Sequence, residues 1–203
     1  MSRRTAFAAA VLAALFCASS TTAAGRPRTL QAGDWRTWWG QAAIENGAYT
    51  LASRAPVSAS ETHSALLTST SSWGDHAFSF TTTTLEQLRA GSRPNAWEVA
   101  WAMFRFRDLE NYYYFILKPN GYELGKKQGS DEQIFLVTGA SPQLALGKRI
   151  RIQIQAQGAR IRVFVDGARI VDFTDPNPLR SGSVGLYEED ARVRFDSVTV
   201  TRL

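Results

Sequence analysis

Beyond Gly47 the chain alternates between apolar and polar residues and almost never repeats at helical spacing. The clearest stretch is 148–173, "KRIRIQIQAQGARIRVFVDGARIVDF", in which isoleucines alternate with arginine and glutamine. Turns are expected near Gly158 and at Asp166-Gly167. A period of two predicts strands with one apolar and one polar face, as in an antiparallel sheet that is wet on one side.

The same alternation between turn signals predicts further strands. They cover residues 47–53, 64–70, 75–84, 97–107, 112–118, 121–127, 133–138, 182–188 and 192–202. The segment 85–95, "LEQLRAGSRPN", is expected to hold one helical turn before Pro94 ends it. About a dozen short strands without a longer helix predict an all-β fold, a two-sheet antiparallel β-sandwich of jelly-roll type. With no repeat or linker, we expect one domain over residues 30–203.

The first residues, "MSRRTAFAAAVLAALFCASSTTAAG", combine a basic start, an apolar run and small residues. This pattern predicts a secretory signal peptide over residues 1–24 and export to the periplasm or the extracellular space. Phe16 before Cys17 argues against a lipoprotein signal, whereas a twin-arginine signal stays open. The apolar run is too short for a membrane span, and no later segment is long enough. Cleavage would remove the only cysteine, so we expect no disulfide.

The charge balance excludes few partners. Without Arg3 and Arg4, the 23 basic residues of the full chain fall to 21 against 18 acidic ones, a net charge of +3. This excess is too small and too dispersed to predict a nucleic-acid partner, and it suits a neutral or an acidic glycan equally well. His63 and His76 lack metal-ligand spacing, and no phosphate loop, dinucleotide fingerprint or nucleophile elbow is present.

Three segments of the chain resemble a known superfamily. They are "WEVAWAMFRFRDLENYYYFILKPNGYELGK", the three-strand run with its "VDG" turn, and the closing "VGLYEEDARVRFDSVTVTRL". Together they resemble the concanavalin A-like lectin and glucanase superfamily, and within it secreted bacterial domains grouped with the 3-keto-disaccharide hydrolase domain and family 16-like glycoside hydrolases. The resemblance covers most of residues 64–203 and implies a jelly roll whose concave sheet meets carbohydrate. It does not imply one activity, because this superfamily includes lectins, binding modules, hydrolases and lyases.

The stretch 111–126, "NYYYFILKPNGYELGK", predicts a hairpin. With Asn120-Gly121 as a two-residue turn, Lys118 is expected directly opposite Glu123. Tyr114 then shares a face with this pair, whereas the tyrosine before it belongs to the core. An exposed ion pair with tyrosines covering a sheet face is the alternative interpretation.

The preceding strand has two possible registers, set by a loop of four or five residues at "RDLEN". The longer loop places Arg105 in the core beside Met103 and Trp101, where an unpaired charge would be expensive. The shorter loop places Phe104 and Phe106 in the core instead, and moves the tryptophan and the arginine to the polar face of the hairpin. We favour the shorter loop.

A sugar site is therefore expected on this polar face. Its predicted contacts are Trp101, Arg105, Tyr114, Lys118 and Glu123. Aromatic plates suit the C–H face of a sugar ring, and charged groups suit its hydroxyls. The two cations would also suit the carboxylate of an acidic sugar.

Enzyme signals are weaker. Family 16 glycosidases carry Glu-x-Asp-x-Glu on one strand, but here Glu188 and Asp190 are followed by Arg192 where the second glutamate should stand. That two-carboxylate mechanism is therefore not carried over. A glycoside hydrolase or polysaccharide lyase using Glu98, Glu123 or the first glutamate of the run as acid or base stays open, as does a structural or adhesion domain.

The last strand suggests a metal. In "RVRFDSVTV" the alternation slips at Asp196-Ser197, which predicts a β-bulge. A bulge frees a backbone carbonyl beside the Asp196 carboxylate, and such oxygens are calcium ligands. The jelly rolls that the chain resembles often hold a structural calcium ion where first and last strands meet, and Asp34 is the expected partner. A plain edge bulge with a solvated carboxylate is the alternative.

Overall fold

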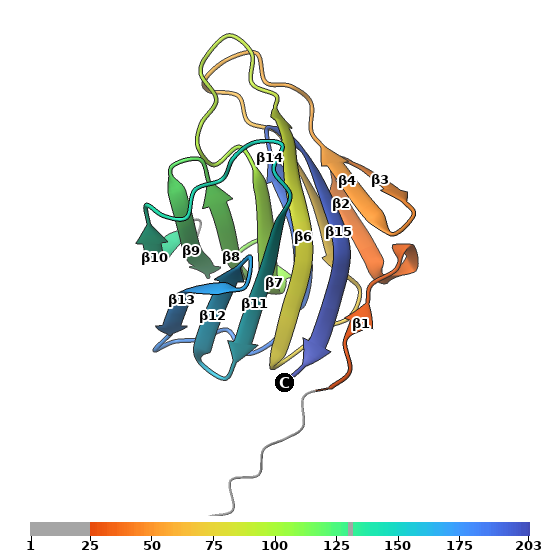
Figure 1. Cartoon of the computed structure of the whole chain (residues 1–203), viewed down its shortest axis with the longest axis vertical. Helices are drawn as coiled ribbons and strands as arrows, with labels where there is room; N and C mark the ends of the chain where they lie inside the picture. Colours follow the sequence, from red (N-terminus) through yellow and green to blue (C-terminus); the bar gives the residue numbers. More distant parts are fainter. Residues whose placement is uncertain (1–24, 130–131) are drawn as a thin grey trace, which may run out of the picture.

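The computed structural model describes residues 25–129 and 132–203, so the predicted signal peptide lies outside the described residues. Two antiparallel sheets pack face to face (Figure 1). The strands of the first sheet are β1 (Arg28–Thr29), β3 (Gln41–Glu45), β4 (Ala48–Ala52), β6 (His76–Gln87), β11 (Ile150–Gln157), β12 (Arg160–Val165), β13 (Ala168–Thr174) and β15 (Ala191–Arg202). This eight-stranded sheet has the order β13-β12-β11-β6-β15-β4-β3, with β1 paired to β15.

The second sheet has seven strands and forms the other layer of the sandwich in Figure 1. Its strands are β2 (Trp35–Trp39), β5 (Ser64–Ser69), β7 (Ala100–Asp108), β8 (Asn111–Lys118), β9 (Gly121–Gln128), β10 (Ile134–Gly139) and β14 (Ser183–Glu189), in the order β10-β9-β8-β7-β14-β5-β2. One short 3-10 helix, Ala32–Asp34, precedes β2. The all-β jelly-roll prediction is confirmed.

The core fills the space between the two sheets. In β11 the isoleucines are buried and the residues between them reach the outer face, as the alternating pattern predicts. From the seven-stranded sheet, Phe104 stacks on Tyr113 with ring centroids 5.1 Å apart, and both side chains are fully buried. Burying a side chain of this size contributes about 1.5–3 kcal/mol, so these inner faces supply most of the stability.

One prediction of secondary structure is wrong, and three strands were not predicted. The helical turn within 85–95 does not form, because β6 continues to Gln87 and pairs there with Ala191 of β15. The sequence analysis also missed β1, β2 and β3. Neighbouring tryptophans, Trp38 and Trp39, obscure the alternation in β2, and a register shift against β5 falls between Thr37 and Trp39.

The β8–β9 hairpin has a register two residues away from the predicted one. Lys118 pairs with Gly121, so Pro119-Asn120 form the turn, and Glu123 lies across from Ile116. Gly121 has φ of +130°, and a Cβ there would stand 1.9 Å from the carbonyl oxygen of Gly139 in β10, so only glycine fits. A shift of two keeps every side chain on its predicted face.

The β7 register is only half as predicted. Trp101 pairs with Ile116, which places it on the outer face of the sheet, and Phe104 lies in the core as expected. Between Phe104 and Asp108 the pairing with β8 shifts, and Arg105 has a φ of +46°. This irregularity turns Arg105 into the interior, so its predicted place on the outer face is wrong.

Phe106 is also misplaced by the prediction, and for the same reason. The side chain is buried as expected, but its ring stacks on Tyr112 of the outer face, with ring centroids 5.7 Å apart, instead of facing the eight-stranded sheet. The predicted bulge at the end of the chain is confirmed, since the pairing of β15 with β6 shifts between Asp196 and Thr199. None of the described residues forms a helix that is long and apolar enough to span a membrane.

Candidate functional site

The outer face of the seven-stranded sheet contains a hollow of about 420 Å³. It is lined by Trp97, Trp101, Ile116, Lys118, Glu123, Gln133, Phe135 and Glu189. A smaller hollow of about 80 Å³ shares Trp101, Gln133 and Glu189 with it, so the two lie side by side. Strands β7, β8, β9, β10 and β14 supply most of the lining, and the segment before β7 supplies Trp97.

An ordered chain of hydrogen bonds joins the polar groups at one side of this hollow. The Tyr114 hydroxyl donates to Glu123 Oε1 at 2.7 Å, and Lys118 Nζ donates to Glu123 Oε2 at 2.8 Å. The charged pair is nearly buried, with side-chain exposures of 16% and 10%. Each carboxylate oxygen has a second lone pair and the ammonium group has further hydrogens, so the pair can both accept from and donate to a ligand.

Glu189 occupies the other side. Its Oε2 accepts a hydrogen bond from the Tyr187 hydroxyl at 3.0 Å, and the Trp97 side chain also hydrogen-bonds to it. Burial raises the pKa of Glu189 to about 6, and the nearby charges of Asp190 and Glu98 act in the same direction. The charge of this carboxylate therefore changes around pH 6, closer to neutral pH than that of an exposed glutamate.

The aromatic residues divide into a floor and a rim. Trp101 is only 5% exposed and packs on Tyr114 and Tyr187, with ring centroids 5.1 Å and 5.4 Å away, while its Nε1 donates to the Trp97 carbonyl at 2.8 Å. Trp97 and Phe135 are 43% and 63% exposed. These two rings are the apolar surfaces that a ligand can reach.

The structure brings together most of the predicted site residues. Trp101, Lys118 and Glu123 line the hollow, and Tyr114 lies fully buried beneath it. Arg105 lies elsewhere. Its guanidinium donates to the carbonyls of Gly158 and Leu179 at 2.7 Å and 2.6 Å and pairs with Asp75 at 3.2 Å.

These bonds also remove the physical objection to a buried Arg105, since a buried charge is tolerated when it is hydrogen-bonded and paired.

The sequence analysis missed Phe135 and Glu189 as site residues. Glu189 stands next to the glutamate that was considered, and Tyr187 pairs with Trp101 in the ladder. Knowing that pairing would have placed Glu189 on the same face, because alternate residues share a face.

Two of the three acid or base candidates lie away from the hollow. Glu98 is fully buried, and its Oε1 accepts from Arg89 Nε at 2.5 Å; the same arginine also donates to Asp190 at 2.7 Å. Glu188 is fully buried; one oxygen accepts from the backbone N–H of Ala191 at 2.9 Å, and the other has no hydrogen-bond partner among the described residues. Burial raises the pKa of Glu188 to about 8. Glu123 is the candidate that borders the hollow.

The predicted calcium ligands are both held by arginine. Asp34 pairs with Arg28 at 2.5 Å, and Asp196 pairs with Arg194 at 3.1 Å. Within residues 25–129 and 132–203, no three His, Cys, Asp or Glu side chains form a group that could hold a metal ion. The two carboxylates do not form the cage of six or more oxygens that Ca²⁺ prefers. Calcium binding stays a prediction.

Comparisons with known proteins identify the family and agree with the fold. The family model described as "3-keto-alpha-glucoside-1,2-lyase-like domain" matches residues 28–201. No curated protein matches the chain. Among solved structures, the carbohydrate binding module CBM66 from Bacillus subtilis is similar, with a TM-score of 0.65 and 20% identity over 82% of this chain and 94% of that one.

Two further structures share the fold. A putative glycosyl hydrolase from Parabacteroides distasonis has a TM-score of 0.57 and 10% identity, covering 84% of this chain and 89% of its own. The exoplasmic/lumenal domain of VIP36, solved in a Ca²⁺/Man3GlcNAc-bound form, has a TM-score of 0.61 and 11% identity, covering 84% of each chain. At these identities the likeness shows the sandwich architecture alone.

Proposed function

Because the chain belongs to the family of 3-keto-alpha-glucoside-1,2-lyase-like domains, we propose that it is a carbohydrate-binding jelly-roll domain whose ligand occupies the hollow on its seven-stranded sheet. The carbohydrate-binding module and the oligosaccharide-bound domain of the same fold support a glycan as the ligand class. The predicted signal over residues 1–24 is part of this proposal, since an exported domain would meet extracellular or periplasmic glycans.

One observation carries the proposal: two exposed aromatic rings stand beside a row of oriented hydrogen-bonding groups in one hollow. Trp97 and Phe135 offer flat apolar surfaces, and Lys118, Glu123 and Glu189 offer donors and acceptors. A sugar ring has an apolar C–H face and a hydroxylated edge, which need this combination. One cation against two carboxylates favours a neutral sugar over an acidic one.

The test uses the exposed rings rather than the buried ones. Trp97→Ala and Phe135→Ala should each weaken glycan binding about tenfold, because losing one stacking contact costs about 1–1.5 kcal/mol. Ile44→Ala, an exposed apolar residue on β3 of the other sheet, is the matched control. Isothermal titration calorimetry on hits from a glycan array measures the change, and parental affinity in both ring variants would refute the assignment.

A second candidate, a glycoside hydrolase or a polysaccharide lyase, is favoured by the carboxylates Glu189 and Glu123 in the same hollow. A group with a pKa of about 6 can give or take a proton near neutral pH. Incubation with glycans and with 3-keto-glucosides should then release reducing or unsaturated sugar. Glu189→Gln should abolish that release while it retains binding; absence of turnover with every substrate would leave the binding function alone.

A structural or adhesion domain is the third class. It would show no affinity for any glycan on the array, whatever the state of the two rings. The array result therefore separates this class from the other two before any variant is made.

A further inference from the structure

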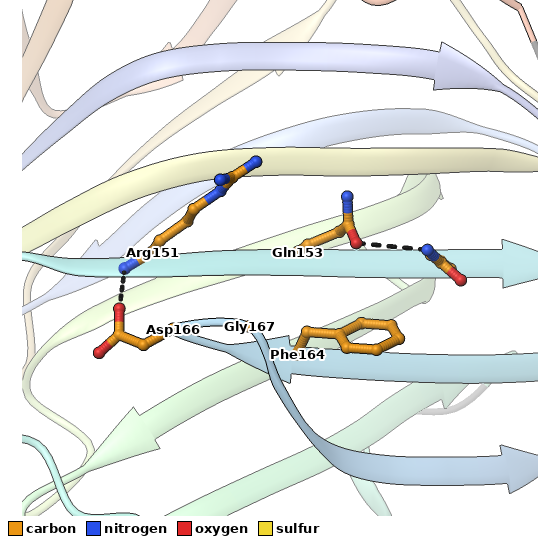
Figure 2. Close-up of a pocket in the computed structure, with 6 residues that line it drawn as sticks. Arg151, Gln153, Phe164, Asp166 and Gly167 are labelled. Atoms are coloured by element: carbon orange, nitrogen blue, oxygen red, sulfur yellow. Dashed lines mark hydrogen bonds between the residues drawn. The ribbon is translucent and has the colours of Figure 1, made fainter.

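The outer face of the eight-stranded sheet holds a second, larger hollow of about 550 Å³. Its lining comes from β11, β12 and the turn that joins β12 to β13 (Figure 2). The lining residues are Arg151, Gln153, Gln155, Phe164, Asp166 and Gly167. None of them belongs to the site described above, which lies on the outer face of the other sheet.

The backbone register explains why a phenylalanine stands on this polar face. Phe164 pairs with Gln153 across the β11–β12 ladder, so the two side chains share the outer face. Its neighbours Val163 and Val165 are buried in the core, and Phe164 is half-buried. Figure 2 shows the ring lying along β12, with Gln153 and Arg151 on the adjacent strand and Asp166 at its end.

The polar groups around the ring are partly ordered and partly free. Gln153 Nε2 donates to Ser79 Oγ at 3.1 Å, and Gln155 Nε2 donates to Gln153 Oε1 at 3.3 Å, which fixes both amides. Asp166 Oδ1 accepts the backbone N–H of Arg151 at 2.8 Å, as drawn in Figure 2. The second oxygen of Asp166 and the guanidinium of Arg151 have no hydrogen-bond partner in the described parts of the chain.

We propose that this hollow is a second glycan site, which takes one unit of a neutral sugar. The C–H face of the sugar ring would stack on Phe164. The sugar hydroxyls would bond to the side-chain oxygen of Gln155, the Arg151 guanidinium and the Asp166 carboxylate. One cation and one carboxylate leave the lining neutral, and an anionic ligand would meet the carboxylate of Asp166.

The inference goes beyond the proposed function because it gives the domain two sites on the outer faces of its two sheets. A single copy would then hold two glycan chains at once and join them. Such bivalency raises the apparent affinity for a polymer without any new contact at either site.

Backbone amide shifts in ¹H–¹⁵N spectra test the two sites separately. The protein without the predicted signal peptide is titrated with neutral gluco-, xylo-, manno- and fructo-oligosaccharides. Uronic acid oligosaccharides serve as the anionic ligands for comparison. Amides of Gln153 and Phe164 should shift with a neutral sugar. Phe164→Ala should weaken this response about tenfold and leave the response at Lys118 and Glu123 unchanged, whereas Trp97→Ala should do the reverse.

Phe164→Leu keeps an apolar side chain but lacks the flat ring, and it should weaken binding as the alanine does. A sugar that shifts only the amides of β7 to β9 overturns the second site and leaves the proposed function standing. Shifts confined to β11 and β12 overturn the proposed function and leave the second site standing. Unchanged shifts in both Phe164 variants, or a response at β11 and β12 to the uronic acids alone, also overturn the inference.

Discussion

The buried carboxyl group of Glu188 should make the stability of this protein depend on pH. The side chain is fully buried, and the desolvation of its charged form raises its pKa from 4.5 to about 8. Hydrogen bonds from Ala191 N–H and the Ser53 hydroxyl oppose this increase, while the charges of Asp190 and Glu189 add to it. We expect Glu188→Gln, a neutral side chain of the same shape, to remove the part of the dependence that this carboxyl group contributes.

The direction of the pH dependence follows from which state, folded or unfolded, keeps the Glu188 proton. Between pH 4.5 and 8 the folded state keeps Glu188 protonated and the unfolded state has released the proton. The free energy of unfolding therefore falls as the pH rises through this window, at about 1.4 kcal/mol per pH unit. Across the window the parent should lose about 3–5 kcal/mol relative to the glutamine variant.

Urea denaturation followed by tryptophan fluorescence at pH 5.0, 7.0 and 8.5 measures the effect. The two proteins should be similarly stable at the lowest pH, and Glu188→Gln should be the more stable at the highest. Glu110→Gln makes the same change on the exposed β7–β8 turn and should follow the parent throughout. A stability difference between Glu188→Gln and the parent that does not vary with pH would refute the reasoning.

Three further predictions address the site and its surroundings. Tyr114→Phe should weaken glycan binding about fivefold in calorimetry, because it removes a hydrogen bond that orients Glu123; unchanged affinity would show that this bond does not matter. Arg105→Met should lower the free energy of unfolding by about 3 kcal/mol and leave the affinity of the folded protein unchanged, since it removes the partner of the Gly158 and Leu179 carbonyls and of Asp75, all of which lie away from the hollow; a selective loss of affinity would instead restore Arg105 as a contact. If Asp34 and Asp196 bind calcium, EDTA should lower the melting temperature and added Ca²⁺ should restore it. An unchanged melting temperature would contradict this prediction.

The fold was predictable because its signal is local. Period-two alternation is visible in the sequence of most strands, and the slip at Asp196 indicates the bulge in β15 without any knowledge of its partner strand. The hairpin kept its predicted faces although its turn lies one residue earlier than expected, because this move changes the pairing register by two residues. The register within β7 was not predictable, since the irregularity at Arg105 depends on carbonyls of Gly158 and Leu179 that belong to distant segments.

The site was predictable to the extent that it lies on one hairpin. Lys118 and Glu123 meet because they share a hairpin face, and Tyr114 joins them from the same strand. Trp97 and Phe135 reach the hollow from outside that hairpin, and their exposure distinguishes them from the buried floor. Exposure depends on what covers a ring, which no single segment of sequence specifies.

The arrangement of acids on β14 favours binding over family 16-like hydrolysis. That mechanism needs carboxylates on alternate residues of one strand, so that two of them face the groove. Here the alternate residues are Glu188 near the end of β14 and Asp190 directly after the strand, and both are fully buried, with Asp190 held by Arg89. The residue between them, Glu189, reaches the hollow, and its counterpart Glu123 comes from β9 already bonded to a lysine and a tyrosine. A carboxylate pair engaged in this way is suited to orienting a sugar, and any turnover would have to use a division of roles different from that of family 16.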